Sequence, residues 1–255
     1  MGEFFFLNGQ IISASEATLK ITDLALLRGY GVFDFCRTHL KQPFLLDQYL
    51  KRFYHSAEHL GLEVPYEMDR IREVIHTLLK QNNIFEAGIR MVLTGGYTDN
   101  GFTPGKPNFF ILIEKINFPS KENYDRGIKL FPYEHQRELS HIKSINYLSA
   151  IALREQLAST GSFDVLFHHQ GHILEVSRSN FFMIKGDTLI TPEHHVLKGI
   201  TRSSVIDLAR PHFDVQERNM KVEELEAADE AFMTGTTKKV LPVVQVGDRV
   251  IGSGQ

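Results

Sequence analysis

The spacing of apolar residues along the first half of the chain predicts a small sheet flanked by helices. Two short apolar runs flank Asn8 and Gly9 in FFFLNGQII, a pattern typical of a β-hairpin. Apolar positions recur at helical spacing from Asp47 onward and again over 68–81, so we expect helices there. Continuous apolar runs predict strands at 32–37, 43–46, 88–93 and 108–113.

In the second half, strand-like and helix-like segments alternate. The predicted strands span 128–131, 164–168, 173–175, 180–185, 188–191 and 230–234. The predicted helices span 144–159, 201–209 and 222–227. This alternation favours an α/β (α+β) fold in two domains. The polar stretch around Pro119 predicts an interdomain linker at 116–122, which separates a small N-terminal domain, 1–115, from a larger C-terminal domain, 123–255, that carries Lys143.

The composition is that of an ordinary globular protein, with 42% hydrophobic and 23% charged residues. A formal net charge of −3 gives no reason to expect a nucleic acid or an anionic membrane as a partner. The single cysteine, Cys36, excludes an intrachain disulfide and suits a reducing compartment. The N-terminal apolar run lacks a basic region and is too short for a signal peptide or a membrane span, so we expect a cytoplasmic protein.

Lys143 and Glu175 are the residues around which the candidate chemistry gathers. Lys143 is flanked by Ile142, Ile145 and Leu148, and an apolar setting lowers the pKa of an amine, which makes it a better nucleophile. Glu175 follows 32 residues later in a strand-like run, where a buried carboxylate needs a cation. Pyridoxal 5'-phosphate would use both groups, because it binds a lysine covalently and needs an acid against its ring nitrogen. Two ordinary surface charges are the alternative interpretation.

Two glycine-containing turns could hold the phosphate of such a cofactor. The segment 197–202 is a glycine turn that opens a helix, so the amides of Ile200 and Thr201 are placed to bind an anion. The segment 234–238 is a second turn, which follows an apolar strand and carries the hydroxyls of Thr236 and Thr237. Two such turns fit one phosphate group.

With these residues in order from about residue 4 to about residue 250, the chain resembles the class IV aminotransferases. These fold-type IV pyridoxal phosphate enzymes comprise D-amino acid transaminases, branched-chain aminotransferases and aminodeoxychorismate lyases. The resemblance implies a homodimer in which Lys143 forms the Schiff base and moves the substrate proton, while Glu175 pairs with the pyridine nitrogen. It assigns contacts with the cofactor phosphate and ring to a larger set: Arg52, Leu197, Ile200, Thr201 and Thr236, with Thr237 as a neighbour.

The carboxylate of an amino acid substrate is usually held by an arginine. Three arginines are candidates: Arg28 in LLRGYGVF, Arg90 in GIRMVL and Arg178 in EVSRSN. Arg90 interrupts an apolar strand, where a charge is costly unless it is paired or faces a ligand. By resemblance, Arg90 matches an arginine of branched-chain enzymes, and Arg178 stands where the familiar D-amino acid transaminases have a serine. Phe33, in the GVFD motif, stands where those transaminases have a tyrosine.

The chain also departs from each subfamily that it resembles. The arginine and histidine that trap the carboxylate in familiar D-amino acid transaminases are absent from its long loop, GGYTDNGF. Gly88 replaces a tyrosine of branched-chain enzymes, and Phe35 replaces a threonine of the lyases. We therefore expect a D-amino acid transaminase whose carboxylate clamp is rebuilt from Arg28 and Arg90, with Arg178 as a further candidate, and whose acceptor is 2-oxoglutarate or pyruvate. A branched-chain L-amino acid aminotransferase is the second interpretation and an aminodeoxychorismate lyase the third.

Two further interpretations bear on the function class. A non-catalytic protein that binds a phosphate ligand would keep the turns but would need neither Lys143 nor Glu175. The histidines of HHQGH, from His168 to His172, do not predict a metal site, because adjacent strand residues face opposite ways and no acid or cysteine completes a ligand shell. We expect this segment to be the tip of a hairpin.

Overall fold

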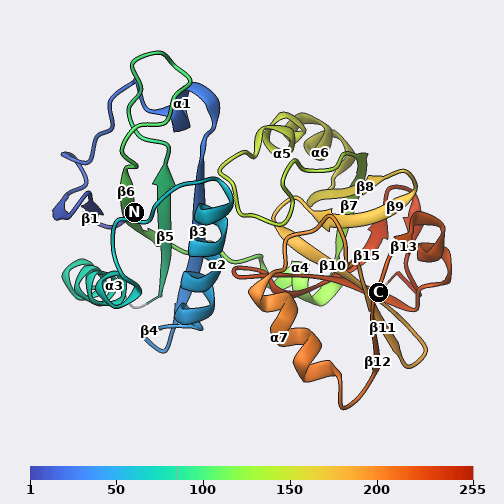
Figure 1. Cartoon of the computed structure of the whole chain (residues 1–255). Helices are drawn as coiled ribbons and strands as arrows, with labels where there is room; N and C mark the ends of the chain where they lie inside the picture. Colours follow the sequence, from blue (N-terminus) through green and yellow to red (C-terminus); the bar gives the residue numbers. More distant parts are fainter. Residues whose placement is uncertain (85, 255) are drawn as a thin grey trace. The chain divides into compact units, whose positions relative to one another are not determined.

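The computed structural model describes residues 1–84 and 86–254, and the chain divides into two compact units. Unit 1 contains Met1–Asn117 together with Ile142–Asn146. Unit 2 contains Phe118–His141 and the chain from Tyr147 onward. We expected Lys143 in the C-terminal domain, whereas the short segment that carries it belongs to unit 1. Figure 1 shows the elements of both units along the chain.

Unit 1 is built on a six-stranded sheet in the order β2-β1-β6-β5-β3-β4. Its strands are β1 (Phe4–Leu7), β2 (Gln10–Ser13), β3 (Gly31–His39), β4 (Gln42–Pro43), β5 (Ala87–Thr94) and β6 (Phe109–Lys115). The expected hairpin is confirmed, because β1 and β2 are joined by Asn8 and Gly9, both at positive φ. Cys36 lies fully buried on β3, and burial raises the pKa of its thiol.

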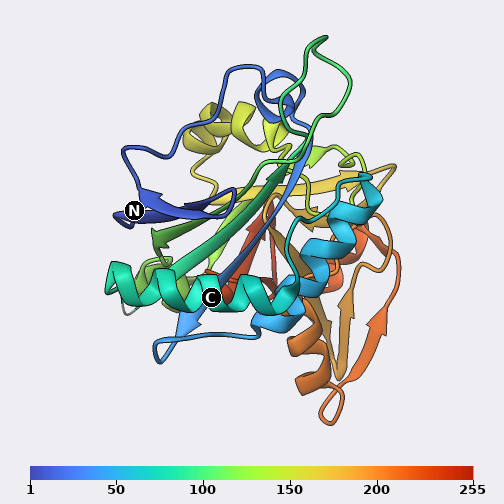
Figure 2. The ribbon, with the colours of Figure 1, turned by 60° about the vertical axis from the view of Figure 1, so that its left-hand side comes forward.

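Two amphipathic helices pack on this sheet, as the apolar spacing predicts. They are α2 (Leu46–His59), next to β3, and α3 (Met68–Asn82), next to β1 and β6. Leu50 and Phe53 of α2 and Ile75 and Leu78 of α3 are fully buried. Figure 2 shows both helices lying across the same face of the sheet.

Unit 2 is built on a mixed sheet that closes on itself. β9 pairs with β10 as well as with β8, which closes a six-stranded barrel in the order β7-β8-β9-β10-β14-β15. These strands are β7 (Ile128–Glu134), β8 (Asp164–His169), β9 (His172–Val176), β10 (Ser179–Lys185), β14 (Glu230–Gly235) and β15 (Lys239–Val246). Shorter strands extend this sheet: β11 (Thr188–Thr191), β12 (Asp214–Glu217), β13 (Met220–Lys221) and β16 (Arg249–Val250). The HHQGH segment is the predicted hairpin tip, between β8 and β9.

The helices of unit 2 differ from the prediction in three places. They are α4 (Lys121–Arg126), α5 (Leu148–Ala152), α6 (Arg154–Thr160), α7 (Ile200–Ala209) and a 3-10 helix, η1 (Val222–Ala227). The helix expected at 144–159 begins only at Leu148 and is divided at Leu153 into α5 and α6. Its first turn is absent because Ser144 forms a bridge with Val32 and the Ile145 amide donates to the Gly31 carbonyl. The expected linker overlaps α4, whose capping box at Ser120 was not recognised in the sequence. The helix expected at 222–227 is of the tighter 3-10 type.

The helices are short. The longest within residues 1–84 and 86–254 is α3, with 15 residues, and none of the helices there has the length and apolar character needed to cross a bilayer.

Asp23 fixes the segment that leads into α1 (Leu24–Arg28). Its side chain is buried, and its Oδ1 accepts a hydrogen bond from the Ala25 amide at 2.8 Å, which caps α1. Its Oδ2 accepts hydrogen bonds from Thr94 Oγ1 at 2.8 Å and from Asn108 Nδ2 at 2.7 Å. One carboxylate therefore joins α1 to the ends of β5 and β6, and α1 carries Arg28.

We expect Asp23→Ala to lower the free energy of unfolding by about 3 kcal/mol, because two buried donors and a helix cap lose their acceptor. Urea unfolding monitored by circular dichroism measures the change. Asp47→Ala is the matched control, since the Asp47 carboxylate is mostly exposed and pairs with Arg72 at the surface. Equal losses in the two variants would contradict the role of Asp23.

Candidate active site

Lys143 is held in unit 1 by its own backbone. The Phe33 amide of β3 donates to the Lys143 carbonyl at 3.0 Å, and the Lys143 amide donates to Ser56 Oγ of α2 at 3.1 Å. The Lys143 ammonium lies 4.6 Å from the centroid of the Phe33 ring. The apolar setting expected from the neighbours is only partly present, because Ile142 is buried whereas Leu148 is 74% exposed.

Phe33 and Arg90 lie on neighbouring strands of the same sheet, β3 and β5. The Arg90 guanidinium lies 5.3 Å from the Phe33 ring and 5.1 Å from the Phe35 ring. It is also paired with Glu114 of β6, with Nε at 2.5 Å from Oε1 and NH2 at 3.1 Å from Oε2. The charge that interrupts the apolar strand is therefore neutralised by a protein carboxylate. Sequence reasoning left open whether Arg90 is paired or faces a ligand, and it did not name Glu114.

Arg52 directs two of its donors at a buried acid. Its Nε lies 2.9 Å from Asp34 Oδ2 and its NH2 lies 2.7 Å from Asp34 Oδ1, and the Asp34 side chain is fully buried. Arg52 lies one helical turn before Ser56 on α2, so one face of this helix holds both β3 and the Lys143 segment. The predicted contact of Arg52 with a phosphate stays a prediction.

Glu175 in unit 2 is buried and has a cation that sequence reasoning missed. Arg137 Nε donates to Glu175 Oε1 at 2.6 Å, and Arg137 NH2 donates to the Ser140 carbonyl at 2.9 Å. The other oxygen, Oε2, accepts from the Leu197 amide at 2.9 Å. The rule that a buried carboxylate needs a cation predicts such a partner, but Arg137 is 38 residues away in sequence and carries no local signal.

Asn180 joins the two glycine turns to Glu175. It lies opposite Glu175 in the β9–β10 pair and opposite Thr234 in the β10–β14 pair, and its Nδ2 donates to the Leu197 carbonyl at 2.8 Å. A β-carbon at Gly199 would collide with Asn180 Oδ1, so a larger residue there would displace the Asn180 side chain. The structure thus brings Glu175, Leu197 and the start of α7 together around one side chain.

The start of α7 has the features of an anion site. The residue before the helix, Gly199, provides no side-chain cap for the first amides, those of Ile200 and Thr201. Two hydroxyls on the neighbouring strands, Ser179 Oγ and Thr234 Oγ1, are buried without a hydrogen-bond partner. Ser179 Oγ also lies beside the second turn, because a β-carbon at Gly235 would approach it to 2.9 Å. Thr236 and Thr237 follow in this turn and are half-buried.

The two other candidate arginines have exposed guanidinium groups. Arg28 ends α1 in unit 1, and its NH1 donates to the Leu27 carbonyl at 2.8 Å. Arg178 lies between β9 and β10 in unit 2, with its side chain 60% exposed and its NH2 3.8 Å from Asp164 Oδ2. Asp164 is buried, and its Oδ1 accepts from Ser177 Oγ at 2.5 Å.

The family of the chain follows from comparison with known proteins. The family described as amino-transferase class IV matches residues 31–246. The chain belongs to the class IV aminotransferases. A protein named putative branched-chain-amino-acid aminotransferase, from Methanocaldococcus jannaschii, is 32% identical over 98% of this chain and 90% of its own length. A D-alanine aminotransferase of Staphylococcus epidermidis is 26% identical over 98% of this chain and 91% of its own length.

Solved structures agree with this assignment. A branched-chain amino acid aminotransferase of Escherichia coli has a TM-score of 0.92 at 25% identity, and the match covers all of this class IV aminotransferase and 90% of that chain. The T.th. branched-chain enzyme, solved with pyridoxamine 5'-phosphate, has a TM-score of 0.90 at 27% identity, over all of this chain and 89% of that one. The expected fold-type IV architecture is confirmed by these matches.

Class IV aminotransferases use pyridoxal 5'-phosphate, so the expected cofactor is confirmed. The residues of this chain fit it. Two buried hydroxyls without acceptors and an uncapped helix start are suited to a phosphate ester, and a buried carboxylate beside Asn180 is suited to a ring nitrogen. The confirmed cofactor and this fit argue against a non-catalytic phosphate-binding protein.

We expect borohydride to fix one cofactor to the protein through Lys143, because the resemblance assigns the covalent bond with the cofactor to this lysine. Mass spectrometry of peptides from the reduced protein should find the added mass on Lys143. Lys143→Ala should lose the addition, whereas Lys185→Ala, at the exposed end of β10, should retain it. Addition at another lysine in the unmodified protein would refute the assignment.

Proposed function

We propose that this class IV aminotransferase transfers the amino group of a D-amino acid to a 2-oxo acid, either 2-oxoglutarate or pyruvate. The single observation that carries the proposal is the pairing of Arg90 with Glu114. Arg90 matches an arginine of the resembled branched-chain enzymes, and here a carboxylate already takes two of its donors. The α-carboxylate clamp is assigned instead to the arginines with exposed side chains, Arg178 and Arg28.

Arg178 is the better supported of the two. Arg178 lies three residues after Glu175, in the connection between β9, which carries Glu175, and β10. Its guanidinium is therefore close in sequence to the carboxylate assigned to the ring nitrogen. Its contact with Asp164 is long, at 3.8 Å, and leaves the planar fork open to a substrate carboxylate. Arg28 contributes a second cation from α1, and in a homodimer this arginine would serve the partner's site.

The proposed roles of the other residues follow from their chemistry. The cofactor, when bound, withdraws electrons from the substrate α-carbon. Lys143 Nζ would accept the proton from that carbon and hold it for return. Glu175 holds its negative charge against the ring nitrogen, and Arg137 with the Leu197 amide fixes the carboxylate in that orientation. In unit 2 the phosphate would be held by Ile200, Thr201, Thr236 and Thr237, and Leu197 would pack against the ring. The resemblance adds Arg52 as a phosphate contact.

A branched-chain L-amino acid aminotransferase is the second candidate function. The 32% identity to the M. jannaschii protein and the TM-score of 0.92 to the E. coli enzyme favour it. Two features disfavour the branched-chain function: Gly88 stands where branched-chain enzymes have a tyrosine, and Arg90 is neutralised by Glu114. The aminodeoxychorismate lyase remains third, because Phe35 stands where the resemblance calls for a threonine hydroxyl.

We expect a panel of enantiomer pairs to separate these functions. The rate of keto acid formation should be greater by at least about tenfold for D-alanine and D-glutamate than for their L forms, with 2-oxoglutarate or pyruvate as acceptor. A rate at least about tenfold greater for L-leucine than for D-leucine would overturn the proposal in favour of the branched-chain function. Release of pyruvate from aminodeoxychorismate would favour the lyase.

The assignment of Arg178 to the clamp is tested by replacing single arginines. Arg178→Leu should raise KM for donor and acceptor by about tenfold or more, because a charge-assisted contact with the α-carboxylate is lost. Arg90→Leu should change KM for D-alanine far less, because Arg90 is held by Glu114. Arg154→Leu, on the exposed first turn of α6, controls for loss of surface charge. Unchanged KM values in Arg178→Leu would exclude Arg178 from the clamp.

A further inference from the structure

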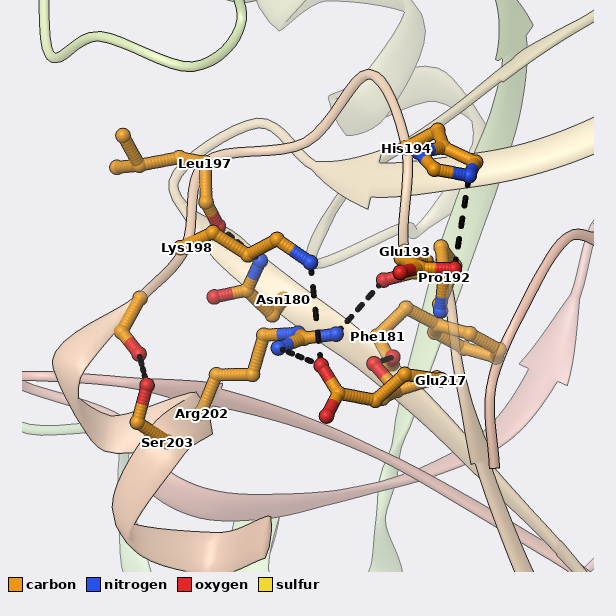
Figure 3. A network of polar contacts seen from close by, with 12 residues as sticks. Asn180, Phe181, Pro192, Glu193, His194, Leu197, Lys198, Arg202, Ser203 and Glu217 are labelled. Atoms are coloured by element: carbon orange, nitrogen blue, oxygen red, sulfur yellow. Dashed lines mark hydrogen bonds and ion pairs between the residues drawn. The ribbon is translucent and has the colours of Figure 1, made fainter. Parts of the chain in front are cut away.

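Arg202 is a buried cation on the first turn of α7. It is among the largest fully buried side chains, at 2% exposed. Its NH2 donates to the Pro192 carbonyl and its NH1 to Glu217 Oε2, both at 2.9 Å, while its Nε is buried without a partner. Figure 3 shows the guanidinium pointing from α7 toward the chain after β11 and toward Glu217. A guanidinium in this position is stable only with a counter-charge.

Glu217 supplies this counter-charge and is shared among three cations. It is the last residue of β12, opposite Thr191 at the end of β11. Besides Arg202, Lys198 Nζ lies 3.8 Å from its Oε2 and Arg210 NH2 lies 3.5 Å from its Oε1. Burial and the Arg202 charge lower the pKa of Lys198, which shows how closely these positive charges are packed.

The turn before α7 is held from both sides. On one side the Leu197 amide and carbonyl are bound by Glu175 and Asn180. On the other side Arg202, three residues after Gly199, binds the chain at Pro192 and Glu217. The orientation of the amides of Ile200 and Thr201 therefore depends on an ion pair that would not itself touch a phosphate.

We propose that Glu217 is a positioning residue for phosphate binding, and that it acts through Arg202 to orient the turn Gly199–Thr201. This inference rests on the proposed placement of the cofactor phosphate at that turn. A positioning role and a simple charge effect predict opposite results. If Glu217 only repelled the phosphate, its neutralisation would strengthen anion binding, since Lys198, Arg202 and Arg210 would lose their counter-charge. If Glu217 orients the turn, its neutralisation weakens anion binding.

The experiment measures binding to the protein after hydroxylamine has released the cofactor from Lys143 and dialysis has removed it. Pyridoxal 5'-phosphate is titrated by its visible absorbance, and inorganic phosphate is titrated as its competitor. We expect Glu217→Gln to raise Kd for both by about tenfold, because an uncompensated Arg202 leaves its present position. The phosphorus NMR resonance of the bound cofactor should shift in the same variant. Unchanged or tighter binding of both ligands would overturn the proposal.

Glu224→Gln is the matched control for a loss of stability alone. Glu224 pairs with Arg218 at 2.6 Å, and its side chain is 31% exposed, close to the 30% of Glu217. Glu224 lies in η1, and its ion pair with Arg218 involves neither α7 nor the turn before α7. We expect Glu224→Gln to lower the melting temperature without changing either Kd or the phosphorus resonance. Equal increases of Kd in the two variants would show a general loss of structure and would overturn the proposal.

Two more variants test whether Glu217 acts through Arg202 and whether the turn Gly199–Thr201 binds the phosphate. If Glu217 acts through Arg202, Arg202→Met combined with Glu217→Gln should bind no more weakly than Arg202→Met alone. Additive losses of affinity in the double variant would show that Glu217 does not act through Arg202. If the turn Gly199–Thr201 is the phosphate site, Thr201→Ala should weaken phosphate binding. If Thr201→Ala weakens binding and Glu217→Gln does not, only the present inference fails; if neither does, the placement of the phosphate fails with it.

Discussion

Pairs of arginine and carboxylate, each with at least one buried member, hold the candidate residues of each unit in place. Arg52 pairs with Asp34, Arg137 with Glu175, and Arg202 with Glu217. Removing a carboxylate or a guanidinium from water costs several kcal/mol, so each member of such a pair holds the other in place. Each pair joins elements that are distant in sequence, and the planar fork of arginine fixes direction as well as distance.

In each unit one of these pairs lies beside a residue to which the chemistry is assigned. In unit 1, Arg52 ties α2 to β3, and the neighbouring Ser56 ties the same helix to the Lys143 backbone. In unit 2, the Arg137 pair orients Glu175, which in turn binds the Leu197 amide. The groups assigned to chemistry are thus held by groups that perform none, which is the arrangement expected of a preorganised site.

Local pattern predicted those parts of the fold whose causes are local. The Asn8–Gly9 hairpin, the helices α2 and α3 and the start of α7 follow from spacing and turn chemistry. The helix expected at 144–159 failed at its first turn, because Ser144 and Ile145 are bound to β3 and tertiary pairing overrides helical propensity. Sequence reasoning missed three partners of charged side chains, Arg137, Glu114 and Asp34, for a related reason. Such a partner is determined by the fold, and the sequence around the charged residue does not indicate it.

Gly88 and Phe35 show how the sheet of unit 1 constrains the history of its sequence. A β-carbon at residue 88 would lie 2.5 Å from Phe35 Cζ, so the ring fills the space that a side chain on β5 would need. The same ring lies 5.1 Å from the Arg90 guanidinium. Subfamily signatures at 35 and 88 are consequently not independent characters. A side chain at 88 requires the ring at 35 to become smaller or to turn aside, and a turn of that ring would also change its contact with Arg90.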